Sequence, residues 1–131
     1  MHPFYAMMLV TGEKTVEIRT WSTEYRGDIL ICSTQKKLHG FISGHAMGIV
    51  ELVDIVPMKK EHVEPALLEP IDYNPSSFAW LLKNPRIIKP IPLKGKLSLW
   101  NYDGDVEVIP APKNDEEDQK LFDMYWKDLI F

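Results

Sequence analysis

Proline spacing is the strongest constraint on what this chain can fold into. Seven of its ten prolines fall within residues 57–92. A long helix cannot form there, because proline inside a helix removes a hydrogen bond and clashes with the preceding turn. The flanking sequence consists of short runs rich in β-branched and other apolar residues, separated by turn residues. The pattern therefore predicts an α+β domain that is mainly β.

The predicted elements are a short helix, then strands, then a second helix. Residues 3–10 are expected to form a helix that Gly12 ends, with Phe4, Met7 and Met8 packed on the core. The expected strands are 15–21, 28–33, 46–58, 78–82, 86–91, one that starts at Leu97, and 106–109, with a helical turn near 60–68, a turn at Asn84-Pro85 and a hairpin turn at Asp103-Gly104. The first two strands are predicted to pair as an antiparallel hairpin, and the apolar second strand is predicted to be central.

Residues 114–131 have the pattern of an amphipathic helix. Asn114 and Glu117 resemble a capping box, and the acidic run at the helix start suits the helix dipole. An apolar stripe follows at helical spacing: Leu121, Phe122, Tyr125, Trp126, Leu129 and Ile130. It is expected to pack either on the domain's own sheet or on a second copy in a homodimer. With a helix at each end, the strands predict a small β-barrel of about five to seven strands. One domain of residues 1–131 is expected.

Composition narrows the classes of function. The net charge of −4 argues against a protein that coats a polyanion, although it permits recognition of one nucleotide or a short single strand. No apolar run is long enough to span a bilayer, so no membrane partner is expected. Cys32, the single cysteine, lies in an apolar run and is expected to be buried, which fits a cytoplasmic protein. The four scattered histidines give no metal-ligand spacing, and no cofactor is predicted.

The strand predicted at 15–21 has one apolar face and one face built for contact. Val16 and Ile18 point to one side, because side chains alternate along a strand. Thr15, Glu17, Arg19 and Trp21 point to the other, with Lys14 at the strand's start. A solvated strand surface with an exposed ion pair explains the charged residues about equally well. Trp21 favours a site, because an indole on a polar face offers a stacking surface for a planar ligand.

The same stretch resembles a known family. Gly12-Glu13-Lys14-Thr15-Val16-Glu17-Ile18-Arg19 is similar to the signature of the ASCH domain family, a branch of the PUA-like β-barrel superfold. The similarity continues through Trp21, 25–28 with the following strand and Ser33, 48–54, 78–82 and 90–96. The C-terminal helix lies outside the matched region.

The resemblance implies a barrel with a cleft beside the first strand, and binding of RNA or a nucleotide. The expected ligand-binding residues are Lys14, Thr15, Glu17, Arg19, Trp21, Tyr25, Arg26 and Ser33. One ASCH subgroup resembles amidohydrolases that act on N4-acylcytidine with a Lys, a Thr and a Glu. The Lys falls on Lys14, but the Thr position is Glu17 here, and the catalytic Glu has no clear counterpart; Glu51 and Glu61 are candidates.

Two functions therefore stay open. In a binding module, Lys14 and Arg19 contact a phosphate or a base acceptor, and Glu17 accepts a hydrogen bond from an exocyclic amine. Trp21 stacks on the base, with Tyr25 or Trp80 as further stacking candidates. In a hydrolase, a desolvated Lys14 serves as general base with Glu17 as its acid/base partner.

Overall fold

A computed structural model of the 131-residue chain describes residues 2–37, 39–92 and 108. One α-helix, four strands and two short 3₁₀ helices make up the described fold. In chain order they are α1 (Pro3–Thr11), β1 (Val16–Arg19), β2 (Gly27–Cys32), β3 (His45–Pro57), η1 (Lys60–His62), η2 (Pro70–Asp72) and β4 (Phe78–Pro92). The prediction of a mainly β domain that begins with a helix is confirmed.

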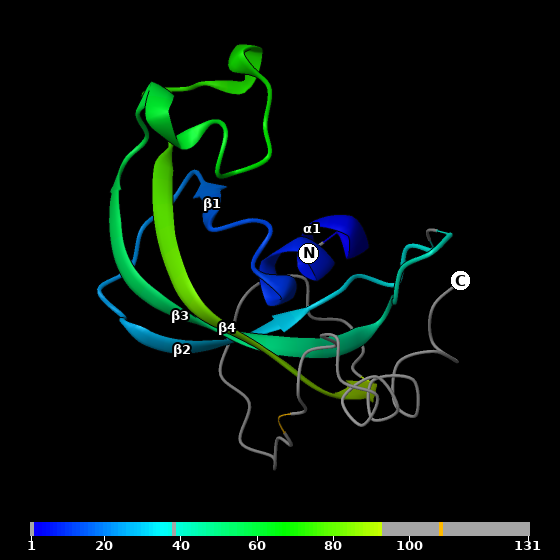
Figure 1. Ribbon diagram of the computed structural model, residues 1–131. Helices are drawn as coiled ribbons and strands as arrows, with labels where there is room; N and C mark the ends of the chain where they lie inside the picture. The colour runs from blue at the N-terminus through cyan, green and yellow to red at the C-terminus, as the bar shows by residue number, and fades with distance from the viewer. Residues whose placement is uncertain (1, 38, 93–107, 109–131) are drawn as a thin grey trace.

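The four strands form one antiparallel sheet in the order β1-β4-β3-β2, strongly curved around α1 (Figure 1). The predicted hairpin of the first two strands is wrong: β1 pairs with β4 and β2 pairs with β3. Among the four described strands β2 lies at the outer position, so the predicted central place of the second strand is not confirmed in this sheet. The long strands β3 and β4 occupy the middle, and their length allows each to hold one of the short strands.

Residues 78–92 form a single strand where two pieces and a turn were predicted. β4 passes through Asn84 and Pro85 without reversing, and it pairs with β3 on both sides of them. Asn84 adopts a left-handed backbone angle (φ 52°), and one extra β4 residue is accommodated between the pairs Glu51–Lys83 and Ile49–Arg86. The Asn-Pro signal therefore marks a β-bulge, which bends the strand and increases its twist.

Helix α1 packs on the concave side of the sheet (Figure 1). Pro3 stands in the first turn and Gly12 ends the helix in the left-handed conformation (φ 85°), as predicted. Its buried residues are Pro3, Ala6, Leu9 and Val10. The last three join the largest core cluster with Trp80, Leu82 and inward-facing residues of β2 and β3. Of the three helix residues predicted to pack on the core, Met7 lies against this cluster, whereas Phe4 and Met8 are only half-buried.

The segment between β3 and β4 folds over the end of the sheet (Figure 1). It contains η1, the turn of residues 63–67 and η2. Ala66 packs with Val16 and Ala79 in a second small cluster. This segment thus covers the side of β1 that carries Val16.

Several predictions fall outside the described residues. They are the strand from Leu97, the hairpin turn at Asp103-Gly104, all of the 106–109 strand except Val108, and the helix of 114–131 with its dimer contact. Val108 forms an isolated bridge with Ile88 of β4. Cys32 is buried, as expected. No helix in the described part of the chain has the length and apolar character that crossing a bilayer requires.

Candidate ligand site

Lys14 and the start of β1 are fixed by backbone hydrogen bonds to three different segments. The Lys14 amide donates to Met8 O of α1 at 2.9 Å, and the Thr15 amide donates to Pro65 O at 3.1 Å. Thr15 O in turn accepts from the Leu82 amide at 3.0 Å. The chain leaves α1 through the left-handed Gly12 and is then held in place, which sets the direction of every side chain that follows.

Lys14, Glu17 and Arg19 form an ion cluster on β1. The Lys14 Nζ lies 3.5 Å from Glu17 Oε1, and the Arg19 Nη2 donates to Glu17 Oε2 at 3.1 Å. The Lys14 ammonium also donates to Ala66 O at 2.5 Å and lies 5.0 Å from the centre of the Tyr5 ring. One carboxylate therefore bridges two cations, and the lysine is held from three sides.

This cluster is buried, contrary to a solvated strand surface. Lys14 is 3% exposed and Glu17 is 8% exposed. Burial lowers the pKa of Lys14 from its ordinary value of 10.5, and the neighbouring Arg19 charge acts in the same direction. The Glu17 carboxylate opposes this shift by favouring the ammonium form. Burying ionised groups is costly unless they are paired, and the pairing of Glu17 with both cations offsets this cost.

The Arg19 Nε is a buried donor of the cluster whose hydrogen bond is unmade. It is a buried side-chain nitrogen without a hydrogen-bond partner among the described residues. The Arg19 side chain as a whole is one-quarter exposed, whereas the Nε atom itself is covered. A buried donor without an acceptor is rare in folded proteins and often marks a place that a ligand or water completes.

Trp21 lies close to this cluster through a shared neighbour. Glu17 is the cross-strand partner of Trp80, and the Trp80 indole lies edge-on to Trp21 with 4.7 Å between the ring centres. The Trp80 Nε1 donates to the Trp21 backbone oxygen at 3.2 Å, which fixes the loop after β1. Trp80 is buried, whereas Trp21 is 44% exposed. Trp21 thus has an anchored backbone and an accessible ring, and it contacts the cross-strand partner of Glu17.

The comparison with known proteins decides the family. The protein-family model described as the ASCH domain matches residues 1–92, which include α1, all four strands and the ion cluster. The chain belongs to the ASCH domain family.

Curated relatives carry the same domain within longer chains. Activating signal cointegrator 1 of Mus musculus is 30% identical and that of Homo sapiens is 29% identical, and both alignments cover 81% of this chain. The chain spans only about a fifth of their length (22%). The alignment is therefore to one part of those proteins.

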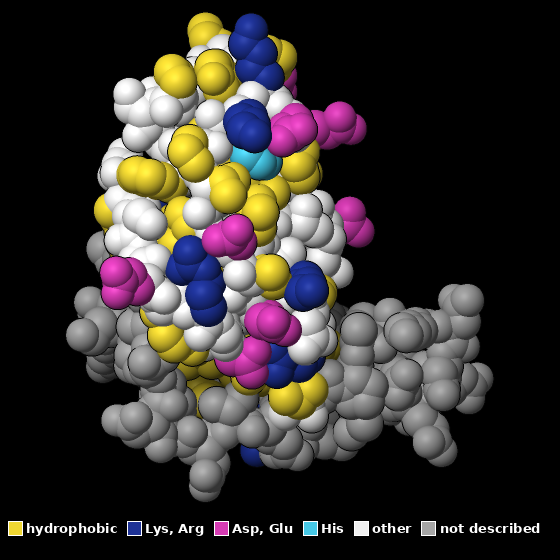
Figure 2. Space-filling model, turned by 90° about the vertical axis from the view of Figure 1, so that its left-hand side faces the viewer, with side chains coloured by type: hydrophobic (Ala, Val, Ile, Leu, Met, Phe, Trp, Pro, Cys, Tyr) yellow, Lys and Arg dark blue, Asp and Glu magenta, His cyan; other side chains and the backbone are white. Residues whose placement is uncertain are grey.

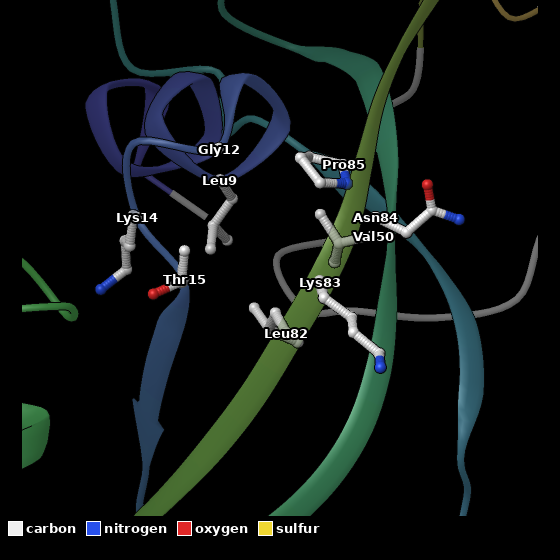
Figure 3. A pocket seen from close by; sticks show the side chains of 9 residues that line it. All are labelled: Leu9, Gly12, Lys14, Thr15, Val50, Leu82, Lys83, Asn84 and Pro85. Atoms are coloured by element: carbon white, nitrogen blue, oxygen red, sulfur yellow. The ribbon is translucent and has the colours of Figure 1, made fainter.

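Thr15 lines a different hollow of the ASCH domain from the one expected. A cavity of about 170 Å³ lies between the end of α1 and the bulge of β4 (Figure 3). It is lined by Leu9, Gly12, Lys14, Thr15, Val50, Leu82, Lys83, Asn84 and Pro85. In Figure 3 the Lys14 ammonium points away from this hollow, and the side chains of Lys83 and Asn84 point outward on the other side. The lining of the cavity is thus mainly apolar.

Three further predicted residues are engaged elsewhere. The Tyr25 hydroxyl donates to Asp28 O at 2.5 Å, and Arg26 pairs with Asp54 at 3.2 Å. The Ser33 hydroxyl lies 3.3 Å from both backbone groups of His45, in the β2–β3 pair. The observed contacts of Tyr25, Arg26 and Ser33 therefore hold β2 to its surroundings, and none joins the ion cluster.

The two candidates for a later catalytic carboxylate are also apart from Lys14. Glu51 is on β3 opposite Lys83, and Glu61 is on η1 with its side chain 72% exposed and 4.0 Å from His62. Reasoning from the sequence missed Tyr5 and the Ala66 carbonyl, which contact the Lys14 ammonium. Because they come from α1 and from a turn more than fifty positions away, only the folded chain reveals them.

The face of the sheet seen in Figure 2 carries charges of both signs, interspersed. Arg86 forms two hydrogen bonds with the Asp28 carboxylate at 2.7 and 3.1 Å, and Arg26 pairs with Asp54. This face has no basic stripe of the kind that follows a nucleic-acid backbone.

Proposed function

We propose that this ASCH domain binds a nucleobase or a short single-stranded RNA beside β1. Arg19 supplies the open hydrogen-bond donor and Trp21 supplies the stacking surface. The observation that carries the proposal is the buried Arg19 Nε without a partner, next to an ion cluster that is otherwise satisfied. An acceptor atom of a ligand, such as a phosphate or base carbonyl oxygen, completes this donor.

The charge of the cluster supports a ligand with acceptor or anionic character. Two cations share one carboxylate, so a positive charge is left over whenever Lys14 is protonated. Both Glu17 oxygens and the Lys14 ammonium already have protein partners. Arg19 is therefore the member that meets the ligand, while Lys14 and Glu17 hold its guanidinium in position. Hydrogen bonds from a guanidinium to an anionic oxygen are among the stronger ones in proteins.

Trp21 gives the contact that single-stranded nucleic acids use most. Stacking of a base on an aromatic side chain contributes about 1–3 kcal/mol and tolerates any base. The exposed Trp21 ring is braced edge-on by Trp80, so little freedom is lost when a base stacks on it. Tyr25, Arg26, Thr15 and Ser33 have no such role in this proposal.

Binding through one arginine and one indole predicts a weak dependence on salt. Each phosphate contact to a single strand lowers the logarithm of the binding constant by about 0.7 per logarithmic unit of salt. One or two contacts therefore give a slope between about −0.7 and −1.4, far shallower than that of a protein that tracks a backbone.

The test is a titration of mononucleotides and short single-stranded RNAs, followed by tryptophan fluorescence and by calorimetry. We expect saturable quenching that Arg19→Lys and Trp21→Ala each weaken about tenfold or more, by roughly 1.4 kcal/mol. Arg86→Lys is the matched control, since Arg86 pairs with Asp28 on another part of the sheet. Absence of binding to wild-type protein at low salt, or equal binding by Arg19→Lys, contradicts the proposal.

A second candidate is an amidohydrolase acting on an N4-acylcytidine-like nucleoside. The observation in its favour is a buried lysine of lowered pKa that lies 3.5 Å from a carboxylate, a pair suited to general base chemistry. Turnover of N4-acetylcytidine that Lys14→Ala and Glu17→Ala both abolish, with their folds intact by circular dichroism, supports it. Turnover by wild type no higher than by these variants refutes it.

We also infer that the chain is one ASCH domain over residues 1–131 whose later strands close the sheet into a PUA-like barrel. The bridge between Ile88 and Val108 supports this inference, because it adds a backbone contact to β4 from the predicted 106–109 strand. Amide hydrogen exchange tests it: protection of residues 106–109 comparable to that of β4 is expected, and rapid exchange there contradicts it.

A further inference from the structure

A second hollow lies in the segment between β3 and β4. It has a volume of about 400 Å³ and is lined by Lys60, Val63, Glu64, Pro70 and Tyr73. None of these residues belongs to the ion cluster of β1. The segment is at the upper end of the molecule in Figures 1 and 2, where hydrophobic side chains gather next to charged ones. Pockets that take ligands or anchor side chains have volumes of about 300–1,000 Å³, so this hollow is large enough for an anchor.

Apolar side chains stand exposed around this hollow. Ile71, between the hollow-lining Pro70 and Tyr73, is 91% exposed, and Leu67 is 37% exposed. Leu67 also has a left-handed backbone angle (φ 57°), which non-glycine residues rarely adopt. A fully exposed isoleucine next to a concave surface is a feature of sites that bury it against a partner.

The charges of this segment specify the partner. Residues 59–73 contain four carboxylates, on Glu61, Glu64, Glu69 and Asp72, against the two lysines Lys59 and Lys60. The Lys60 ammonium lies 6.0 Å from the centre of the Tyr73 ring, so one of the two lysines is directed to the wall of the hollow. A net negative rim repels phosphate groups, whether of RNA or of an anionic lipid, and attracts lysine and arginine.

We propose that the acid-rimmed hollow of residues 59–73 is a docking site for a protein segment in which an apolar anchor is flanked by basic residues. The anchor enters between Val63, Pro70 and Tyr73 and covers Ile71. The flanking lysines or arginines meet Glu61 and Glu64. This surface is separate from the proposed RNA site, and its occupancy does not depend on RNA binding.

The experiment is fluorescence anisotropy of the full chain with a fluorescein-labelled peptide that has a leucine pair flanked by lysines. Two matched peptides carry glutamates in place of the lysines, or serines in place of the leucines. We expect saturable binding of the basic apolar peptide only. We expect the affinity to fall about tenfold or more for Glu61→Lys/Glu64→Lys and for Ile71→Ser, and to weaken with added salt because exposed charges are screened.

The controls lie on exposed positions away from the hollow. Glu13→Lys matches the charge reversal and Val53→Ser matches the loss of an exposed apolar side chain, and neither is expected to alter peptide binding. Failure of the wild type to bind the basic apolar peptide, or equal binding of all three peptides, overturns the proposal. So does a wild-type dimer that Ile71→Ser dissociates, because a second copy is then the occupant. The Glu61→Lys/Glu64→Lys variant is expected to bind RNA no more weakly than wild type, which separates this test from that of the β1 site.

Discussion

Replacing Glu17 by glutamine is the sharpest perturbation of the ion cluster. The change keeps the shape of the side chain and removes the negative charge between Lys14 and Arg19. Removing one partner of a buried ion pair costs about 3–5 kcal/mol, because an uncompensated charge stays buried. Here part of that cost is relieved, since the Arg19 side chain is one-quarter exposed and Lys14 keeps its bond to Ala66 O. We therefore expect Glu17→Gln to lower the free energy of unfolding by about 2–4 kcal/mol.

Urea denaturation measures this loss. With a denaturant dependence of about 2 kcal/mol/M, the midpoint falls by roughly 1–2 M. The double variant Lys14→Met/Glu17→Leu is expected to be much closer to wild type, because apolar residues of similar volume replace a buried ion pair at little cost. Glu13→Gln is the matched control, because Glu13 is an exposed acid in the turn before β1. This variant is expected to change stability by less than about 0.5 kcal/mol. A loss for Glu17→Gln as small as that of Glu13→Gln would refute the argument that the cluster is buried.

Three further predictions concern pH and packing. Folding lowers the pKa of Lys14, so the unfolded chain binds more protons than the folded chain between the folded pKa and 10.5. The stability of wild type relative to Lys14→Met should therefore rise with pH across that window, and a stability difference that does not change with pH contradicts this. The Arg86 guanidinium lowers the pKa of Asp28, so their pair should add about 0.2–1 kcal/mol to stability above pH 3.8, and this contribution should disappear as the pH falls through the lowered pKa. A double-mutant cycle at two pH values measures the coupling energy, and coupling that persists in acid contradicts the prediction. Gly48→Ala places a methyl group 2.5 Å from both Arg86 O and Val10 Cγ1, and this overpacking should lower the unfolding free energy by about 1–3 kcal/mol in thermal or urea melts. A variant as stable as wild type contradicts this close approach of β3 and β4.

Local signals in the sequence were sufficient for the helix and for the existence of the strands. Pro3 and Gly12 mark the two ends of α1 by their backbone preferences alone, and both act there. The pairing of the strands could not be predicted from such local signals. β1 and β2 are separated by a short loop that favours a hairpin, yet each finds its partner in a strand of thirteen or fifteen residues farther along the chain. The long strands offer more backbone hydrogen bonds and more buried area than a hairpin of two short strands.

The bulge at Asn84 shows why turn residues are ambiguous. Asn-Pro is compatible with a chain reversal and also with a left-handed residue inside a strand. The outcome depends on the pairing of β4 with β3 on both sides, which is a tertiary effect.

The three charged members of the ion cluster could be named from the sequence, but their burial could not. The order of Lys14, Glu17 and Arg19 placed three charges at the start of one strand, and the structure joins them. A strand pattern cannot show that α1 and the turn at Ala66 both contact Lys14. The Ala66 carbonyl and the Tyr5 ring turn Lys14 from a surface lysine into a buried one. Ser33 illustrates the reverse case, since its hydroxyl lies against the His45 backbone, away from the cluster.

The most direct test of the account is the nuclear magnetic resonance signal of the Arg19 Nε–H group during a titration with a short single-stranded RNA. If this donor binds a ligand acceptor, its resonance should shift saturably with the same dissociation constant that tryptophan fluorescence gives. The side-chain resonance of Arg86 should not shift. Binding that leaves the Arg19 Nε–H resonance unmoved, or no binding at all, would contradict the central claim.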